Sequence, residues 1–150
     1  MGKSAASFVV VCLVGCASAA RGPGDAEVRA ALDTQLQEVV QGVGAGNVAA
    51  VLAHFAPDGQ MVLRGVVGPD GEMLNVDYAG AQQIGAFLGQ IGAPPDFVME
   101  VAAFERSGGE ATQSGRWSVA GGEQAGTFSV NWLQSSDGMW RIVHWRFDGG

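Results

Sequence analysis

The sequence predicts an α+β fold, with helices packed on one face of an antiparallel β-sheet. Apolar residues recur at helical spacing through much of the stretch from residue 25 to residue 91, and four long extended segments follow residue 96. Short turns rich in Gly, Ser and Asp separate these segments, so each strand should pair antiparallel with its neighbour. Helices followed by such a meander of strands are typical of the α+β class.

Three helices are expected, at about residues 25–43, 47–55 and 78–91. Asp25 has the residue type of an N-cap for the first helix, and glycines 42, 44 and 46 are expected to end it. The proline pair at residues 94–95 closes the third helix.

A strand at residues 60–67, a turn at 69–72 and a short extended piece separate the second and third helices. Four longer strands are expected at about residues 97–106, 110–120, 125–134 and 139–147. The side chains expected to fill the space between helices and sheet are Leu32, Leu36, Phe55, Phe87, Leu88, Phe104, Phe128 and Ile142.

Residues 1–15 have the features of a secretory signal peptide: the basic Lys3, an apolar run too short to span a bilayer, and small residues at its end. The following Leu-Val-Gly-Cys, ending at Cys16, resembles the bacterial lipobox, so we expect Cys16 to be lipidated. The alternative is ordinary cleavage after the Ala-Ser-Ala of residues 17–19. Residues 16–24 then form a tether and residues 25–150 one domain. An alanine rather than an aspartate after the cysteine favours the outer membrane of a Gram-negative host.

The chain after residue 15 keeps seven Arg and no Lys against fifteen Asp and Glu, a formal charge of 7 − 15 = −8. Such a surface repels phosphate backbones, which excludes nucleic acid as a partner. Membrane contact is therefore expected only through the acyl chains on Cys16. Both cysteines precede the domain, so disulfides and thiolate chemistry are excluded within it. With His54 and His144 as the only histidines, no metal and no cofactor are expected.

Three local motifs carry a family resemblance. Residues 53–59 (Ala-His-Phe-Ala-Pro-Asp-Gly) resemble the end of the second helix in SnoaL-like domains, and residues 80–87 resemble their third helix. Residues 137–144 (Asp-Gly-Met-Trp-Arg-Ile-Val-His) resemble their last strand. Over about residues 26–148, the chain is thus similar to the nuclear-transport-factor-2-like superfamily. The resemblance implies a cone of three N-terminal helices on a strongly curved sheet with a ligand cavity between them. It does not imply one reaction, because the superfamily includes isomerases, dehydratases and non-catalytic binders.

The last predicted strand supplies the main candidate site. Many relatives continue it as His-x-His-x-Ser, whereas this chain has His144, Arg146 and Asp148. Strict alternation would place Trp140, Ile142, His144 and Arg146 on one face. His144 and Arg146 would then point into the mouth of the cone and bind a carboxylate there. The alternative is a core histidine beside an arginine that is paired with an acidic neighbour.

Four further residues are weaker candidates. Trp132, Trp140 and Asn131 are candidate lining residues of the same mouth, with core or surface positions as the alternatives. Asp33, on the first helix, is a candidate general base, with a solvated helix flank as the alternative. Isomerases of the superfamily pair such a carboxylate with a tyrosine, but the one tyrosine here, Tyr78, does not match that position.

Two functions are compatible with these features. The first is a bacterial cell-envelope lipoprotein whose domain binds a small molecule or acts as a dimeric scaffold. The second is a small cofactor-independent enzyme of the ketosteroid-isomerase or SnoaL-like cyclase type, with Asp33 or His144 as the base. Because the last strand carries large apolar residues on both predicted faces, a homodimer through the sheet is also expected.

Overall fold

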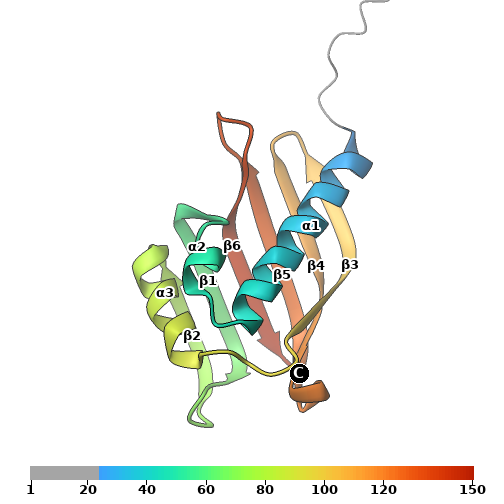
Figure 1. Cartoon of the computed structure of the whole chain (residues 1–150). Helices are drawn as coiled ribbons and strands as arrows, with labels where there is room; N and C mark the ends of the chain where they lie inside the picture. The colour runs from blue at the N-terminus through green and yellow to red at the C-terminus, as the bar shows by residue number, and fades with distance from the viewer. Residues whose placement is uncertain (1–23) are drawn as a thin grey trace, which may run out of the picture.

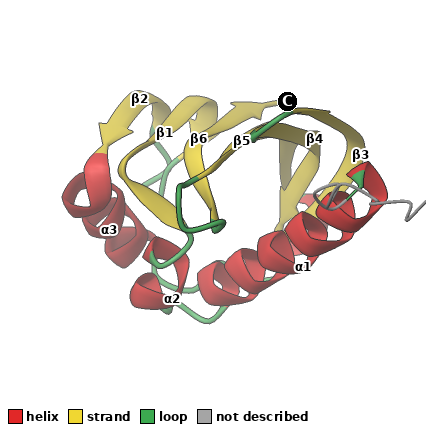
Figure 2. Ribbon diagram, turned by 90° about the horizontal axis from the view of Figure 1, so that it is seen from above, coloured by secondary structure: helices red, strands yellow, loops and turns green. Residues whose placement is uncertain are grey.

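A computed structural model describes residues 24–150; the predicted signal peptide, Cys16 and most of the tether lie outside the described residues. Three helices lie on one face of a six-stranded sheet, as Figure 1 and Figure 2 show. The helices are α1 (Asp25–Gly44), α2 (Val48–Leu52) and α3 (Gly80–Ile91). The strands are β1 (Phe55–Val67), β2 (Met73–Ala79), β3 (Val98–Ser107), β4 (Glu110–Val119), β5 (Gln124–Gln134) and β6 (Trp140–Gly149), with a short 3-10 turn η1 (Ala120–Gly122) before β5.

The sheet has the order β2-β1-β6-β5-β4-β3. The neighbouring strands β1 and β6 run parallel, and every other neighbouring pair is antiparallel. The three helices leave the opposite face of the sheet uncovered, and we call the two faces inner and outer (Figure 2). None of the helices between residues 24 and 150 is both long enough and apolar enough to cross a membrane.

The α+β class and the four long C-terminal strands are confirmed. Three helices ahead of the sheet are not confirmed, because the β1–β2 hairpin separates α2 from α3. Helix α2 is also shorter than predicted, because β1 already begins at Phe55. Phe55 pairs with Ile142, whose N–H donates to the carbonyl oxygen of His54 at 2.8 Å, so the parallel pairing with β6 starts where a helical turn was expected. Strong curvature of the sheet stays a prediction.

The start of α1 also differs from the prediction. Gly24 is the N-cap and makes no side-chain capping bond, whereas Asp25 lies in the first turn and its carboxylate is 3.3 Å from Arg106 of β3. Gly42 and Gly44 lie inside the helix rather than beyond its end. A Cβ atom at Gly42 would come within 2.9 Å of Val51 Cγ2, so a glycine here allows the close approach of α1 and α2.

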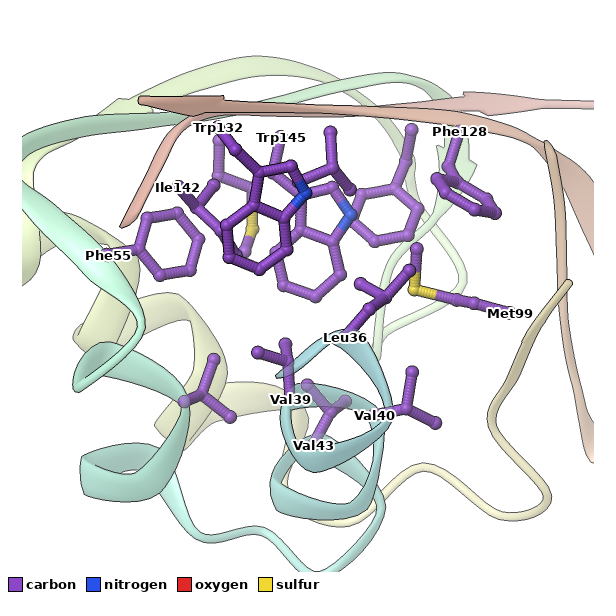
Figure 3. Packing of buried hydrophobic residues seen from close by; sticks show 14 of the residues in the cluster. Leu36, Val39, Val40, Val43, Phe55, Met99, Phe128, Trp132, Ile142 and Trp145 are labelled. Atoms are coloured by element: carbon purple, nitrogen blue, oxygen red, sulfur yellow. The ribbon is translucent and has the colours of Figure 1, made fainter. Parts of the chain in front are cut away.

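The core lies between the helices and the inner face of the sheet (Figure 3). Seven of the eight residues predicted to be buried are buried, and Phe104 is partly buried. Trp132 and Trp145 are the bulkiest of the fully buried side chains, and they pack over α1 through residues such as Leu36. The sequence therefore identified the central layer of the core correctly.

A β-bulge at Val143 decides which side chains of β6 face inward. Trp132 of β5 pairs with Ile142, whereas the preceding Asn131 pairs with His144, which leaves Val143 as an extra residue in β6. An extra residue shifts the alternation of side chains by one position. The inner face of β6 accordingly carries four large apolar side chains, and the outer face beyond the bulge carries polar ones. The inner set is Trp140, Ile142, Trp145 and Phe147.

The β5–β6 turn provides a test of local electrostatics. Asp137 accepts hydrogen bonds from the Ser135 hydroxyl, from the Met139 N–H and from Arg141. These bonds, that from Ser135 first, lower the pKa of Asp137 from 3.8 to about 2. Since the pKa of Asp137 is lower in the folded state, its contribution to stability is complete above pH 3.8 and is lost as the pH falls through about 2.

An NMR titration of Asp137 in the folded chain should give a midpoint at a pH of about 2. Ser135→Ala should raise this midpoint, because it removes the hydrogen bond that contributes most to the shift. An unchanged midpoint in that variant would contradict the assignment.

Candidate functional site

The candidate site is a cavity of about 350 Å³ between the inner face of the sheet and α3. It lies toward the end of the molecule that carries η1 and the β1–β2 turn, away from the first residue of α1 (Figure 1). The sheet contributes Met61, Leu63, Val66, Val67, Trp117, Val119, Gln124, Trp145 and Phe147, the helices contribute Val43, Phe87, Leu88 and Ile91, and the connecting segments contribute Gly68, Pro69, Pro94, Pro95, Phe97 and Ala120.

The cavity lining is almost entirely apolar. Gln124 is its one side chain with an amide, and no Asp, Glu, His, Lys, Arg, Cys or Tyr is among the described residues that line it. A dry apolar cavity binds apolar molecules because transferring their surface out of water is favourable. The arrangement is thus suited to holding a molecule by burial rather than by charge.

Aromatic rings form the part of the wall contributed by β4 and β6. The ring of Phe147 lies 4.7 Å from that of Trp145 and meets Trp117 edge-on at 5.9 Å, measured between centroids. Trp117 Nε1 donates to the carbonyl oxygen of Asp148 at 3.2 Å, whereas Trp145 Nε1 is buried without a partner. An unsatisfied buried donor of this kind costs about 1–3 kcal/mol of stability.

The rim of the cavity is tied together by a backbone hydrogen bond. The N–H of Ala120, in η1, donates to the carbonyl oxygen of Pro95 at 2.7 Å and so links η1 to the segment that follows α3. Ala120 has φ of 52°, a left-handed conformation that costs a non-glycine residue about 1 kcal/mol or more. The strained backbone of Ala120 thus accompanies the hydrogen bond that holds η1 against the segment after α3.

The predicted placement of His144 and Arg146 is wrong. The bulge at Val143 puts both on the outer face, where His144 lies opposite Asn131 and Arg146 lies opposite Ser129. None of these residues lines the cavity. The same shift removes the premise for expecting a homodimer, because the large apolar residues of β6 all face inward; the dimer itself stays a prediction.

Arg146 has an acidic partner on its own strand. Its Nε and Nη2 donate to the two carboxylate oxygens of Asp148 at 2.8 and 2.7 Å. This contact lowers the pKa of Asp148 and raises that of Arg146, in each case mainly through the side-chain hydrogen bond. Arg146 therefore gives no positive potential to the cavity mouth, and the alternative of an arginine paired with an acidic neighbour is the one observed.

Trp132 and Asp33 belong to a hydrogen-bonded chain away from the cavity. Trp132 Nε1 donates to Gln113 Oε1 at 2.8 Å, and Gln113 Nε2 donates to Asp33 Oδ1 at 2.7 Å. Gln113 is fully buried, so these two bonds satisfy an amide that would otherwise be costly. Asp33 does not line the cavity, and its position is that of an acceptor at the helix flank. Trp140 is a buried core residue that also lies outside the cavity wall.

We expect Asp33→Ala to destabilise the fold through Gln113. Removing the carboxylate leaves the buried amide N–H without an acceptor, which costs about 1–3 kcal/mol, partly offset by the higher helix propensity of alanine. Asp33→Asn keeps a side-chain oxygen and should cost less. Arg29→Ala is the control, because the Arg29–Asp33 contact is exposed and 4.0 Å long, so its loss should change stability by about 0.5 kcal/mol or less. Equal losses for the Ala and Asn variants in urea unfolding would contradict this role.

The sequence contained a signal for the cavity that strict alternation misassigned. Strict alternation along β6 places Trp145 and Phe147 on the face opposite Trp140, yet both are wall residues of the cavity. The available signal for the bulge was the presence of large apolar residues on both predicted faces of the strand. Such a pattern is explained by a partner subunit that covers the second face, and equally by a bulge that turns both sets of residues to the same face.

Solved structures share this fold. A nuclear-transport-factor-2-like protein of unknown function from Shewanella baltica matches with a TM-score of 0.67 and 14% identity, over 86% of this chain and 98% of that one. A similar protein from Silicibacter pomeroyi gives 0.66 and 19%, over 85% and 100%. A ketosteroid isomerase-like protein from Erwinia carotovora atroseptica gives 0.62 and 14%, over 80% and 94%. At such identities the likeness establishes the fold alone. No family model and no curated protein matches the sequence.

Proposed function

We propose that this protein is a binding module of the bacterial cell envelope that holds a neutral, mainly apolar molecule in the cavity between α3 and the sheet. The observation that supports this proposal is the cavity of about 350 Å³, whose lining has no ionisable side chains. A cavity of about 150 Å³ lined by apolar residues holds benzene. The larger volume here suits a molecule with about two rings, within the usual size range of small-molecule sites.

The lining favours a neutral molecule over the carboxylate suggested by the sequence. A buried carboxylate needs a cation or several hydrogen-bond donors to offset the loss of water. His144 and Arg146, which were to supply them, lie on the outer face, and Arg146 is paired with Asp148. A neutral molecule avoids this cost.

The enzymatic alternative has less support from the same geometry. A general base must come within hydrogen-bond reach of the proton that it removes. Neither of the two candidate bases, Asp33 and His144, lines the cavity, and Asp33 accepts a hydrogen bond from Gln113. The likeness to a ketosteroid isomerase-like protein concerns the fold and supplies no base here.

Binding of the neutral dye N-phenyl-1-naphthylamine tests the proposal. Its fluorescence should rise with saturation on mixing with the protein, and Val66→Trp, at the cavity wall, should abolish the rise by filling the space. Leu133→Trp is the matched control, because Leu133 is 43% exposed and lies outside the cavity lining. Unchanged dye binding in Val66→Trp, with the fold intact by circular dichroism, would rule out the cavity as the site. If Val66→Trp does abolish the rise, native mass spectrometry of protein purified from its own host would identify a molecule retained in the cavity.

The envelope part of the proposal depends on Cys16. We expect Cys16→Ser either to release the protein into the soluble fraction or to leave the signal unprocessed, because the serine hydroxyl cannot form the thioether to the diacylglycerol. The measurement is membrane fractionation followed by intact mass. A Cys16→Ser protein that is cleaved normally and still sediments with membranes would contradict lipidation at this residue.

A further inference from the structure

Gln124 contributes the one amide side chain to the lining of the cavity. It lies on β5 shortly after η1, at the end of the molecule where the rim of the cavity is (Figure 1). Strand β5 pairs with β4 without a shift of register, so every second residue of β5 faces inward, and Phe128 and Val130 of this set are buried in the core. Gln124 belongs to the same set, so its side chain faces the space between sheet and helices.

The amide of Gln124 is accessible to a bound molecule. Gln124 is partly exposed, and its side chain makes no hydrogen bond to another described residue. Its amide atoms are not buried either, because within residues 24–150 Trp145 Nε1 is the one side-chain nitrogen or oxygen that is both buried and without a partner. Gln113, also on the inner face, is fully buried and is bonded to Trp132 and Asp33. The fold thus uses the amide of Gln113 and leaves that of Gln124 available.

The exposure of the wall residues gives the cavity a buried part and an open part. Met61 and Trp145 are each 1% exposed, whereas Val67 is 38% exposed. Gln124 belongs with the partly exposed residues of the open part. An elongated molecule in the cavity therefore packs its apolar part against the buried wall and brings its other end to Gln124.

The charges around the open part disfavour an anionic group at that end. The carboxylate of Glu72 accepts from the N–H of Asp70 at 2.9 Å, and a Cβ atom at Gly68, a lining residue, would overlap it, so its charge lies at the edge of the cavity. The segments that line the rim, residues 68–72, 92–97 and 120–123, also carry Asp96 and Glu123 and contain no Lys, Arg or His. Like charges repel an anion there.

We propose that the molecule held in the cavity is amphipathic, with an apolar body against the buried wall and an uncharged hydrogen-bonding group, such as a hydroxyl or a carboxamide, that pairs with the amide of Gln124. This inference rests on the proposed function and narrows its class of molecule. A hydroxyl accepts from Nε2 or donates to Oε1, the two roles that the amide offers. A hydrocarbon of the same shape displaces water from the amide without replacing its hydrogen bonds, which lowers affinity.

Two ligands of nearly the same shape test the inference. The first is 2-(2-naphthyl)ethanol, and the second is 2-propylnaphthalene, in which a methyl group replaces the hydroxyl. Dissociation constants are measured by displacement of N-phenyl-1-naphthylamine from the full chain, unmodified and with Gln124→Leu. The hydrocarbon leaves water more readily than the alcohol by the same amount in both experiments, so the ratio of the two constants is compared. We expect Gln124→Leu to lower the affinity for the alcohol relative to the hydrocarbon about tenfold, the effect of one net hydrogen bond.

Gln134→Leu is the matched control, because it removes an amide from the same strand. That amide already donates to the carbonyl oxygen of Gly138 at 3.1 Å, and Gln134 lies outside the cavity lining, so the ratio should not change. In the unmodified protein, nuclear Overhauser effects should connect the side-chain amide protons of Gln124 with the CH₂ group beside the hydroxyl of the bound alcohol. This measurement does not depend on a variant folding. The anion 2-naphthylacetate should bind more weakly than the alcohol, and added salt should reduce the difference by screening the carboxylates.

The outcomes distinguish this inference from the function on which it rests. If the dye does not bind and neither naphthalene binds, the cavity is not a binding site and both proposals fail. If both naphthalenes bind but the ratio is the same in Gln124→Leu, or the amide protons of Gln124 contact the ring end remote from the hydroxyl, the cavity is a site and the role of Gln124 is overturned. An anion that binds as tightly as the alcohol would overturn the requirement for an uncharged group.

Discussion

Leu36→Ala is expected to lower the free energy of unfolding by about 2–5 kcal/mol, a large part of the stability of a domain of this size. Leu36 is fully buried on α1 and projects toward the sheet beside Trp145 and Met99 (Figure 3). Truncation removes apolar contacts and leaves a void that the two tryptophan-bearing strands cannot readily fill, because β5 and β6 are fixed by their pairing.

Gln37→Ala is the matched control for this substitution, because residue 37 is exposed on the same helix and its truncation should change stability by about 0.5 kcal/mol or less. The measurement is urea or thermal unfolding followed by circular dichroism. If Leu36→Ala and Gln37→Ala have the same free energy of unfolding, the packing of α1 on the sheet is not what stabilises the domain.

The helices, the strands and most of the core could be predicted because each depends on local information. Glycine-containing turns bound the strands of the second half, and the apolar spacing of α1 marks Leu32 and Leu36 as inward-facing. The errors occurred where long-range pairing decides the structure. Phe55 begins a strand instead of ending a helix because it pairs with Ile142, and nothing within a few residues of Phe55 indicates that partner.

The bulge at Val143 shows why the site could not be predicted in the same way. Without it, one face of β6 would combine Ile142 with His144 and Arg146, and Trp145 would face outward. With the bulge, the large apolar side chains of β6 are buried and its charged side chains reach solvent. Alternation along a strand is a local rule, but the choice of where to break it depends on the total free energy of burial over β1, β5 and β6. The predicted placement of His144 and Arg146 at the cavity mouth was wrong for that reason.

The cavity was also beyond the sequence, because its wall residues come from segments far apart in the chain. Leu63 of β1, Phe87 of α3 and Trp145 of β6 meet only once the sheet and α3 are assembled. Each was recognisable as apolar, but whether such residues fill their space or leave a cavity depends on the tertiary arrangement. Sequence reasoning predicted a recess between sheet and helices, and the structure has a cavity there, but none of the candidate ligand-binding residues lines it.

Gly126→Ala is expected to destabilise the domain by about 3 kcal/mol or more, the upper part of the range for overpacking. A Cβ atom at residue 126 would overlap the carbonyl oxygen of Asp148 and lie 2.8 Å from Trp117 Nε1. Both neighbours belong to the same contact, since Trp117 donates to that oxygen. The methyl group would therefore force β5 away from the end of β6 and break the bond that holds a wall residue of the cavity.

Gly89→Ala provides a control of opposite sign, which makes the comparison independent of any general effect of alanine. Gly89 lies exposed in α3 with nothing within 4 Å of the position that a Cβ atom would take, so the substitution should stabilise the helix by about 0.5–1 kcal/mol. Urea unfolding of the two variants should thus move in opposite directions, and only Gly126→Ala should also weaken dye binding, through the displaced Trp117. A Gly126→Ala protein as stable as the unmodified chain would show that β5 and β6 do not approach as closely here as their pairing requires.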